Sequence, residues 1–143
     1  MEIIVTRINI LPVECLTDQH LVAEYKEITR PFTKMRHRMQ TNNTDFTTTE
    51  DYVLGSGHET FFFDKLEFLF KRYQALATEM LNRDMNVDIA KFSEVYTDLA
   101  NNFKHTQFWN DWQPTPREIY LNMARLCRRS KLTNVLDELQ SDA

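Results

Sequence analysis

One stretch of the sequence places a histidine and two carboxylates within helical reach of one another. His20, Glu24 and Glu27 are spaced i, i+4 and i+7, which puts them on one face of a helix. Such a trio could bind a metal ion, because imidazole and carboxylate groups are common ligands. No supporting pair of ligands stands out elsewhere, so the composition favours the alternative, a salt-bridged surface.

Glu27 also has cationic neighbours, with Lys26 beside it and Arg30 three residues further on. A carboxylate held among cations stays ionised. An ionised carboxylate suits the stabilisation of a positive centre that develops during a reaction. Glu27 is therefore a candidate catalytic residue.

The cations of this stretch form a basic ridge, defined by Lys26, Arg30 and Lys34 at i, i+4 and i+8. Residues 26–38 carry a local charge of +4. A solvated helix face is the ordinary interpretation of such a run. The functional alternative is a ridge that follows DNA phosphates.

A short glycine-containing segment, LGSGH at 54–58, precedes a predicted helix. Gly55, Gly57 and His58 could receive a phosphate there, since helix N-termini bind anions. The segment lacks the preceding strand and third glycine of a dinucleotide fingerprint. A plain turn before a helix is the alternative that this pattern favours.

Apolar residues at helical spacing predict the elements that position these groups. The first stripe predicts an unbroken helix from Thr17 or Asp18 through Met39, kinked at Pro31. Further helices are expected from near Thr60 to Asn82, over 88–102, over 116–130 and, frayed, over 132–139. Residues 40–50 read as a loop, and residues 105–116 read as an ordered loop pinned by Phe108, Trp109 and Trp112.

Thr115, Pro116 and Glu118 form a capping-box signal at the start of the helix predicted over 116–130. Glycine and proline are scarce, with two and four residues, which disfavours an all-β domain. The sequence thus predicts an all-α, compact single domain of three main helices plus minor helices.

Composition sets the outer limits. The 143 residues suit one domain, and no apolar run is long enough to span a membrane. No secretory leader is expected, and Cys15 and Cys127 read as reduced thiols of an intracellular protein. The net charge of −4 argues against a generic nucleic-acid binder, but residues 117–131 carry a second local +4, so the acidity lies elsewhere.

Three motifs carry a resemblance to a known family: TRIN at 6–9, DQHLVAEYKE at 18–27 and LGSGHETFFFDKLEFLFKR at 54–72. In order and spacing they resemble the bacteriophage pyrimidine-dimer DNA glycosylases called endonuclease V. PREIYLNMARL at 116–126 is similar to the third helix of that family, less closely. The resemblance implies an endonuclease V-like all-α fold.

The resemblance also implies an activity: N-glycosylase and AP-lyase chemistry on double-stranded DNA, with one nucleotide flipped out of the stack. A threonine α-amine attacks the deoxyribose beneath a damaged pyrimidine, a Schiff base forms, and β-elimination cuts the strand. No cofactor or metal is expected, because imine chemistry needs neither. The resemblance further implies a monomer. The expected location is the cytoplasm, that of the host if the protein is phage-encoded, and no membrane partner is expected.

Carried over by position, the nucleophile matches Thr6 and the catalytic glutamate matches Glu27, flanked by Lys26 and Arg30 as further catalytic candidates. In the family the position of Lys26 is an arginine. The expected DNA-binding residues are Arg7, His20, Glu24, Lys34, Gly55, Gly57, His58, Lys71, Arg72 and Arg125.

The sequence departs from the family before Thr6, where MEIIV makes the Thr6 nitrogen an amide rather than an amine. Three interpretations follow. Translation could start at a GTG codon at Val5, Lys26 could supply the amine instead, or the protein could no longer cut DNA. On this basis residues 1–5 are an N-terminal extension of the single 1–143 glycosylase-like domain.

A second departure is the tail at 131–143, which replaces the aromatic, basic C-terminal segment of the family. Trp109 and Trp112 could stack on bases instead, although core packing is the preferred interpretation. The expected function is a DNA-repair glycosylase and lyase acting on damaged duplex DNA, with pyrimidine dimers as the expected lesion. The alternatives are a non-catalytic or re-specialised DNA-binding homologue and a helical protein-interaction module.

Overall fold

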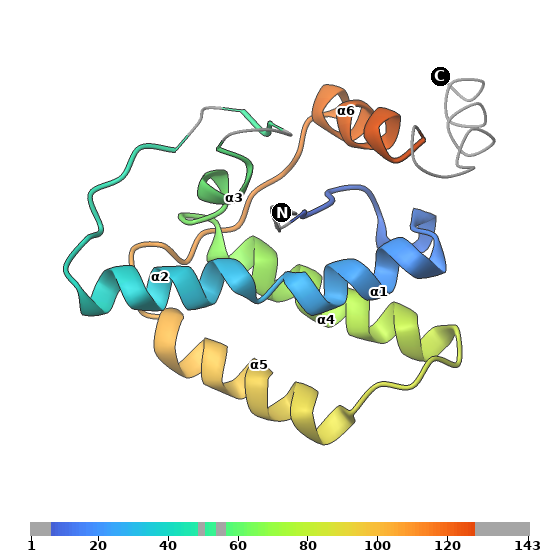
Figure 1. The fold of residues 1–143 in the computed structure, drawn as a ribbon, viewed down its shortest axis with the longest axis horizontal. Helices are drawn as coiled ribbons and strands as arrows, with labels where there is room; N and C mark the ends of the chain where they lie inside the picture. The colour runs from blue at the N-terminus through green and yellow to red at the C-terminus, as the bar shows by residue number, and fades with distance from the viewer. Residues whose placement is uncertain (1–6, 49–50, 54–56, 128–143) are drawn as a thin grey trace, which may run out of the picture.

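The computed structural model describes residues 7–48, 51–53 and 57–127, which form helices joined by irregular segments (Figure 1). This arrangement confirms the predicted all-α class. The helices are α1 (Asp18–Glu27), α2 (Arg30–Gln40), α3 (His58–Phe61), α4 (Leu66–Asn82), α5 (Ile89–Phe103) and α6 (Pro116–Cys127), with a short 3-10 helix at Val13–Cys15. Within this part of the chain, no helix combines the length and the apolar character needed to cross a membrane.

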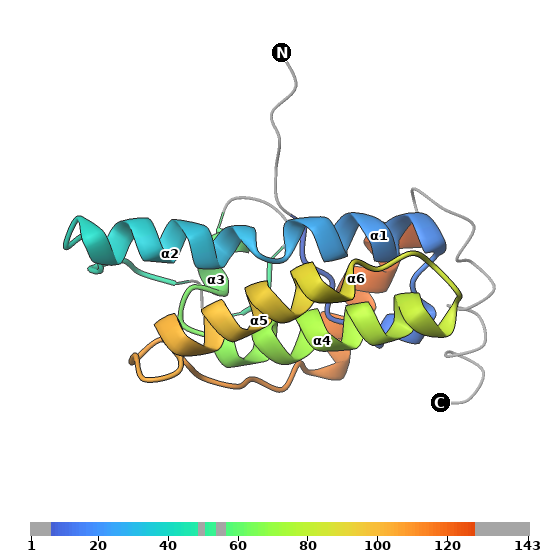
Figure 2. The same cartoon turned by 90° about the horizontal axis from the view of Figure 1, so that it is seen from below.

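The first predicted helix is divided into two. Thr17 caps α1 as expected, because its Oγ1 accepts a hydrogen bond from the His20 amide at 3.2 Å. The helix stops at Glu27, and α2 starts at Arg30 with Pro31 in its first turn. A proline at this position has no N–H to donate to the Glu27 carbonyl. The prediction of one unbroken helix is therefore wrong, although α1 and α2 still follow one another along nearly one line (Figure 2).

The second predicted helix starts later than its apolar pattern indicated. A single turn, α3, is followed by a non-helical turn, and α4 begins only at Leu66. The first amides of α4 donate to backbone carbonyls of the 104–115 loop, from Leu66 to Phe108 at 3.1 Å and from Phe68 to Asn110 at 3.2 Å. These partners replace a side-chain cap. A start near Thr60 is thus wrong, while the end at Asn82 is confirmed.

The last two described helices follow their capping signals. Asp88 caps α5 by accepting from the Lys91 amide at 3.0 Å. Thr115 and Glu118 form the predicted capping box before α6, with Thr115 N–H to Glu118 Oε1 at 2.9 Å and Glu118 N–H to Thr115 Oγ1 at 3.2 Å. Residues 128–130 of the predicted helix, and the helix predicted over 132–139, lie outside the described residues.

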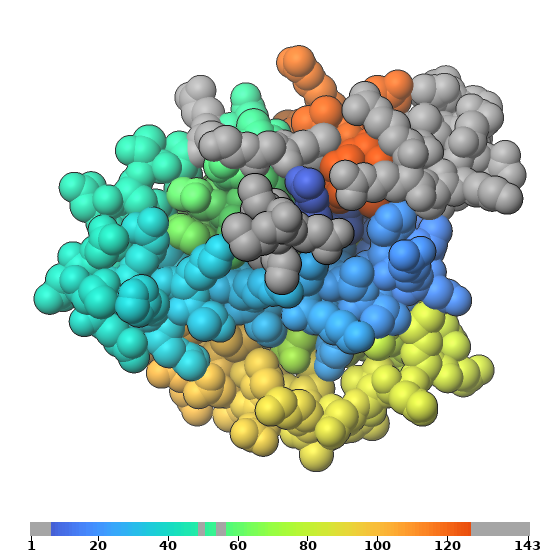
Figure 3. Space-filling model, viewed as in Figure 1, coloured from blue at the N-terminus to red at the C-terminus, as the bar shows by residue number. Residues whose placement is uncertain are grey.

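The core lies between these helices. The helix α4 packs against α1 on one side and against α5 on the other (Figures 1 and 2). Phe108 is buried and Trp112 stands edge-on to Phe61 at 5.0 Å, so this aromatic loop is core, as preferred from the sequence. The N-terminal segment, residues 7–12, enters between α1 and α6, while α1 and α2 form a continuous band across this face of the molecule (Figure 3).

Candidate active site

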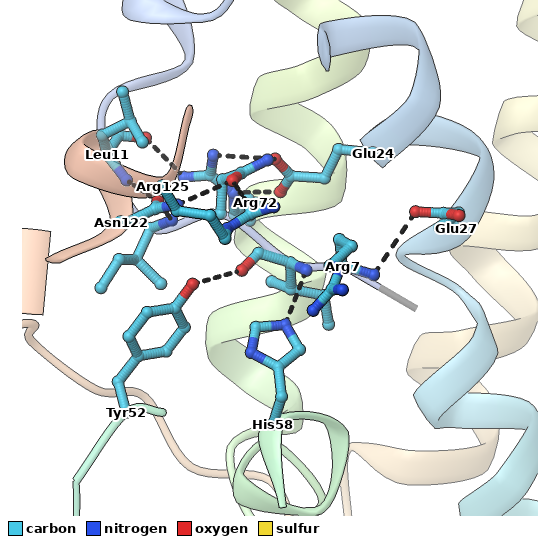
Figure 4. Close-up of polar contacts among 12 residues, drawn as sticks. Arg7, Leu11, Glu24, Glu27, Tyr52, His58, Arg72, Asn122 and Arg125 are labelled. Carbon is cyan, nitrogen blue, oxygen red and sulfur yellow. Dashed lines mark hydrogen bonds and ion pairs between the residues drawn. The ribbon is translucent and has the colours of Figure 1, made fainter. Parts of the chain in front are cut away.

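The N-terminal segment belongs to no helix, and no strand pairs with it among the described residues. Ile8, Asn9, Ile10 and Leu11 are nonetheless at most 4% exposed. Buried backbone N–H and C=O groups require hydrogen-bond partners. Here side chains from the surrounding elements provide them (Figure 4).

Two aromatic side chains hold Ile8. The Ile8 amide donates to Nε2 of His58 at 2.9 Å, and its carbonyl accepts from the Tyr52 hydroxyl at 2.9 Å. On its other side the His58 ring donates from Nδ1 to the Val53 carbonyl at 2.7 Å. These two bonds select the neutral tautomer with the proton on Nδ1. The pKa of His58 is lowered to about 4, mainly by burial and in part by the positive charges of Arg125 and Arg7, while the hydrogen bond to the Val53 carbonyl opposes this shift.

Two more side chains hold the far end of the segment. Asn122 of α6 accepts from the amides of Ile10 at 2.7 Å and Leu11 at 3.4 Å. Arg72 of α4 donates from Nη1 to the Leu11 carbonyl at 2.8 Å. The segment is therefore tied to both α4 and α6.

A buried polar cluster, made of Asn9, Glu24, Arg72 and Asn122, lies beneath these bonds. Arg72 pairs with Glu24 through Nε and through Nη2, the latter at 3.2 Å, with side-chain exposures of only 8% and 1%. Asn9 donates to Glu24 at 2.9 Å and accepts from Asn122 at 2.8 Å. Arg125 of α6 also donates to Asn9. The ion pair is thus fully hydrogen-bonded, as a buried charge requires.

Glu27 occupies the last position of α1, next to Arg7 of the N-terminal segment. Its carboxylate accepts from the Arg7 backbone amide at 3.4 Å through Oε2 and from Arg30 Nη1 at 3.4 Å through Oε1. The Glu27 side chain is 22% exposed. Both contacts are long, so the carboxylate retains capacity to accept another proton donor or to face a cation. An open groove beside it is lined by Asp18, Lys26 and Arg30, among others.

The other members of the basic ridge lie at the surface. Lys26 is exposed on α1, next to the groove. Lys34 of α2 is 56% exposed and forms an ion pair with Glu59 of α3 at 2.7 Å. The ridge therefore runs along the α1–α2 band. Within it, Arg30 pairs with Glu27 and Lys34 pairs with Glu59.

The residues predicted from the sequence separate into three groups. Arg7, Glu27, Lys26 and Arg30 come together at the α1–α2 junction, and Lys34 lies one turn further along α2. The side chains predicted to contact DNA from Glu24, His58 and Arg72 are instead buried and bonded to the N-terminal segment or to each other. Thr6, which is covalently joined to the Arg7 amide nitrogen, lies outside the described residues, as does Gly55.

The remaining predictions fall at the edges of the site. The His20 ring contacts its own helix cap, with Nδ1 2.9 Å from Thr17 Oγ1. Lys71 pairs with Asp111 at 2.8 Å. Gly57 has a left-handed φ of 89°, which glycine adopts at low cost, and it precedes the α3 turn that carries His58. In the described part of the chain, no group of three or more His, Cys, Asp or Glu side chains could hold a metal ion.

Sequence reasoning missed Asn9, Tyr52, Asn122 and Glu59. Asn122 carried a usable signal, because it lies three residues after Ile119 and four before Leu126, on the buried stripe of α6. Tyr52 and Asn9 lie in irregular segments where no periodicity marks the buried positions. Their roles depend on contacts with distant parts of the chain.

A comparison with protein families gives an independent result. The family described as "Pyrimidine dimer DNA glycosylase" matches residues 3–93. The match spans the N-terminal segment, α1 to α4 and the first residues of α5, and so includes Glu27, His58 and Arg72. The α6 partners Asn122 and Arg125 lie beyond it.

Proposed function

The chain belongs to the pyrimidine dimer DNA glycosylase family, and on that premise we propose that it is a DNA-repair N-glycosylase with AP-lyase activity on damaged duplex DNA. The proposed substrate is a pyrimidine dimer, as the family description indicates. The proposed unit is a monomeric, glycosylase-like domain formed by residues 1–143. Residues 1–5 and the tail at 131–143 lie outside the described part of that domain.

The observation that supports this most directly is the position of Glu27. Its carboxylate lies 3.4 Å from the Arg7 backbone nitrogen, which is bonded to Thr6, and beside the cations of an exposed basic ridge. A carboxylate at this place can stabilise a cationic sugar and move protons during imine formation. The cations beside it can hold the phosphates of the same strand.

The proposed chemistry proceeds by covalent catalysis. An amine nitrogen attacks C1′ of the damaged nucleotide, and the base leaves with the electron pair of the glycosidic bond. Ring opening gives an imine between the amine and C1′. Loss of a proton from C2′ and of the 3′-phosphate by β-elimination then cuts the strand. Glu27 is the proposed proton carrier and electrostatic partner of the sugar cation.

Two amines are candidates for the nucleophile. Thr6 has an α-amine only in a chain that begins with it, and it is bonded to the nitrogen that approaches Glu27. Lys26 is exposed beside the groove that Glu27 lines. Thr6 is the preferred candidate because the N-terminal segment is held in place by side chains from α3, α4 and α6.

The DNA-binding roles are proposed for the surface residues. Arg7, Lys26, Arg30 and Lys34 are proposed to contact phosphates along the α1–α2 band. For Glu24, Arg72 and Arg125 we propose a different role from DNA contact, because Glu24 and Arg125 bond to Asn9, and Arg72 bonds to the Leu11 carbonyl, in the N-terminal segment. They hold that segment in place.

Borohydride trapping tests this function, because borohydride reduces an imine to a stable covalent adduct. The protein as given and a version starting at Thr6 are incubated with a duplex that carries a cyclobutane dimer or an abasic site. We expect an adduct with the Thr6 version and a loss of about 100-fold or more in trapping rate for Glu27→Gln. An adduct that forms with the longer chain and disappears in Lys26→Ala identifies the lysine as the nucleophile.

If neither of the two versions forms an adduct, the enzymatic proposal is overturned. Duplex binding that is then weakened by substitutions at Lys26, Arg30 and Lys34 favours the non-catalytic DNA-binding alternative. A matched variant outside the ridge, Lys104→Ala on the exposed surface after α5, serves as the binding control.

A further inference from the structure

We infer that His58 is a positioning residue for the proposed reaction: its imidazole fixes the Ile8 amide and thereby keeps the start of the N-terminal segment against Glu27. The inference rests on the proposed function, because it concerns the placement of the segment that carries the proposed nucleophile. His58 itself lies on the opposite side of this segment from Glu27 (Figure 4).

The His58 ring is fixed from both of its nitrogens. Nε2 accepts from Ile8 at 2.9 Å and Nδ1 donates to Val53 at 2.7 Å, so neither rotation nor a flip of the ring preserves both bonds. Tyr52 and Phe62 stand edge-on to the ring at 5.3 and 5.7 Å. With 2% exposure, the residue has no access to water that could replace these bonds.

The position of the Ile8 amide affects the contact between Arg7 and Glu27. Ile8 follows Arg7, whose own amide approaches Glu27 at 3.4 Å, at the long end of hydrogen-bonding distance. A displacement of the segment by a fraction of an ångström therefore removes the Arg7–Glu27 contact. The shorter Ile8–His58 bond, at 2.9 Å, is the stronger restraint on that position.

A neutral imidazole is suited to this arrangement because it is an acceptor on one side and a donor on the other. Lysine and arginine only donate, and an ionised carboxylate only accepts. Asparagine and glutamine each reproduce one half of the arrangement. The Asn amide can donate near the position of Nδ1, and the Gln carbonyl oxygen can accept near the position of Nε2.

The test compares two variants of His58. His58→Gln keeps an acceptor for the Ile8 amide, whereas His58→Asn keeps only a donor to the Val53 carbonyl. The trapping rate is measured in single turnover at saturating protein on an abasic-site duplex, and the Kd for the same duplex is measured separately. We expect His58→Gln to trap within about 3-fold of the parent rate and His58→Asn to be at least about 10-fold slower, with Kd unchanged, since small misplacements reduce rates strongly. Leu99→Ala in α5, a destabilised variant distant from the segment, is expected to keep the parent rate per folded molecule.

Amide hydrogen exchange gives a readout that does not depend on turnover. The Ile8 and Arg7 amides are expected to exchange at least about 10-fold faster in His58→Asn, and at the parent rate in His58→Gln, because protection follows the hydrogen bond. Equal trapping by Asn and Gln variants, or an Asn defect no larger than that of Leu99→Ala, overturns the inference. An adduct that forms neither with the protein as given nor with the version that starts at Thr6 overturns the proposed function. Exchange that is unchanged in the Asn variant overturns the restraint on Ile8.

Discussion

The two sides of α4 are packed in different ways. Toward α5 the contacts are mainly aromatic and apolar, with Phe70 of α4 stacked on Tyr96 of α5 at 4.1 Å and Tyr73 of α4 packed on Phe92 of α5 at 4.9 Å. Toward α1 and the N-terminal segment, α4 contributes Arg72, which is buried and bonded to Glu24 and Leu11.

The two kinds of packing have different consequences, one for the stability of the fold and one for the exact position of the N-terminal segment. Apolar contacts depend on area and volume and tolerate small shifts. A buried hydrogen-bonded ion pair gains little net stability over an apolar replacement, yet it holds only when every partner is in place. The α5 side therefore supports the fold, while the N-terminal side fixes the position of a short segment beside Glu27.

The largest effect is expected from breaking the buried ion pair. Arg72→Met keeps a long side chain but leaves the Glu24 carboxylate buried without its cation, so the free energy of unfolding should fall by about 3–5 kcal/mol. Urea denaturation measures the change. Adding Glu24→Gln should recover part of the loss, because it removes the uncompensated charge. A loss below about 1 kcal/mol for Arg72→Met contradicts the assigned role of the pair.

On the α5 side, a cavity should reduce stability and leave the chemistry intact. Leu99 is 4% exposed, and Leu99→Ala should lower the free energy of unfolding by about 3 kcal/mol through lost contacts and a residual cavity. The trapping rate per folded molecule should not change, because the N-terminal segment keeps all its partners. A rate that falls with stability would show that the two sides of α4 are coupled.

The pH dependence of stability should be concentrated on the N-terminal side. The pKa of buried His58 is lowered from 6.5 to about 4. Between pH 6.5 and pH 4, this histidine is therefore protonated in the unfolded chain and neutral in the folded protein. Stability contributed by the neutral ring is complete above pH 6.5 and is lost as the pH falls toward 4. The loss between pH 7 and pH 4.5 should be about 2 kcal/mol.

Urea unfolding of the parent protein and His58→Gln at the two pH values isolates this contribution. Glutamine does not titrate, so the variant should show a smaller decrease in stability on acidification. Carboxylates that titrate in the same range contribute equally to both proteins. Identical decreases in the two proteins would contradict the buried, neutral state of His58.

The parts of the fold that were predictable depend on local signals. Asp88 and the pair Thr115–Glu118 cap their helices through neighbouring residues, so the starts of α5 and α6 could be predicted. The start of α4 could not, because its first amides bond to carbonyls of Phe108 and Asn110, about 40 residues away in sequence. The division between α1 and α2 was also missed, since the apolar stripe keeps its phase through residues that are not assigned to either helix.

The buried polar cluster left a trace in the sequence. Glu24, Arg72 and Asn122 each lie three residues after one apolar stripe position and four before another, so each occupies a core-facing position. This spacing predicts burial but not the partner. The resemblance indicated Glu27 and Arg7 as site residues, whereas the bonds of His58 to Ile8 and Val53 depend on how separate segments meet.

The smallest expected effect compares two ion pairs of equal length at the surface. Lys34–Glu59, on the side of the proposed site, and Arg36–Asp98, on the α5 side, both measure 2.7 Å. Surface pairs contribute at most about 1 kcal/mol. The two pairs differ in that the Glu59 side chain is 16% exposed and the Asp98 side chain is 52% exposed. If DNA follows the basic ridge, a phosphate must replace the Glu59 carboxylate on Lys34. Glu59 therefore competes with DNA, and Asp98 does not.

Glu59→Gln should strengthen duplex binding by about 2- to 5-fold at low salt, because it removes the competing charge without removing the side chain. Among the described residues, Glu59 Oε1 is buried and has no hydrogen-bond partner, so neutralising this carboxylate also relieves a desolvation cost and should not unfold α3. Asp98→Asn is the matched control and should leave Kd unchanged. Duplex affinity is measured by fluorescence anisotropy titration. Equal increases in affinity for both variants would contradict the proposed DNA-binding role of the ridge, because α5 would then face the DNA as closely as the α1–α2 junction does.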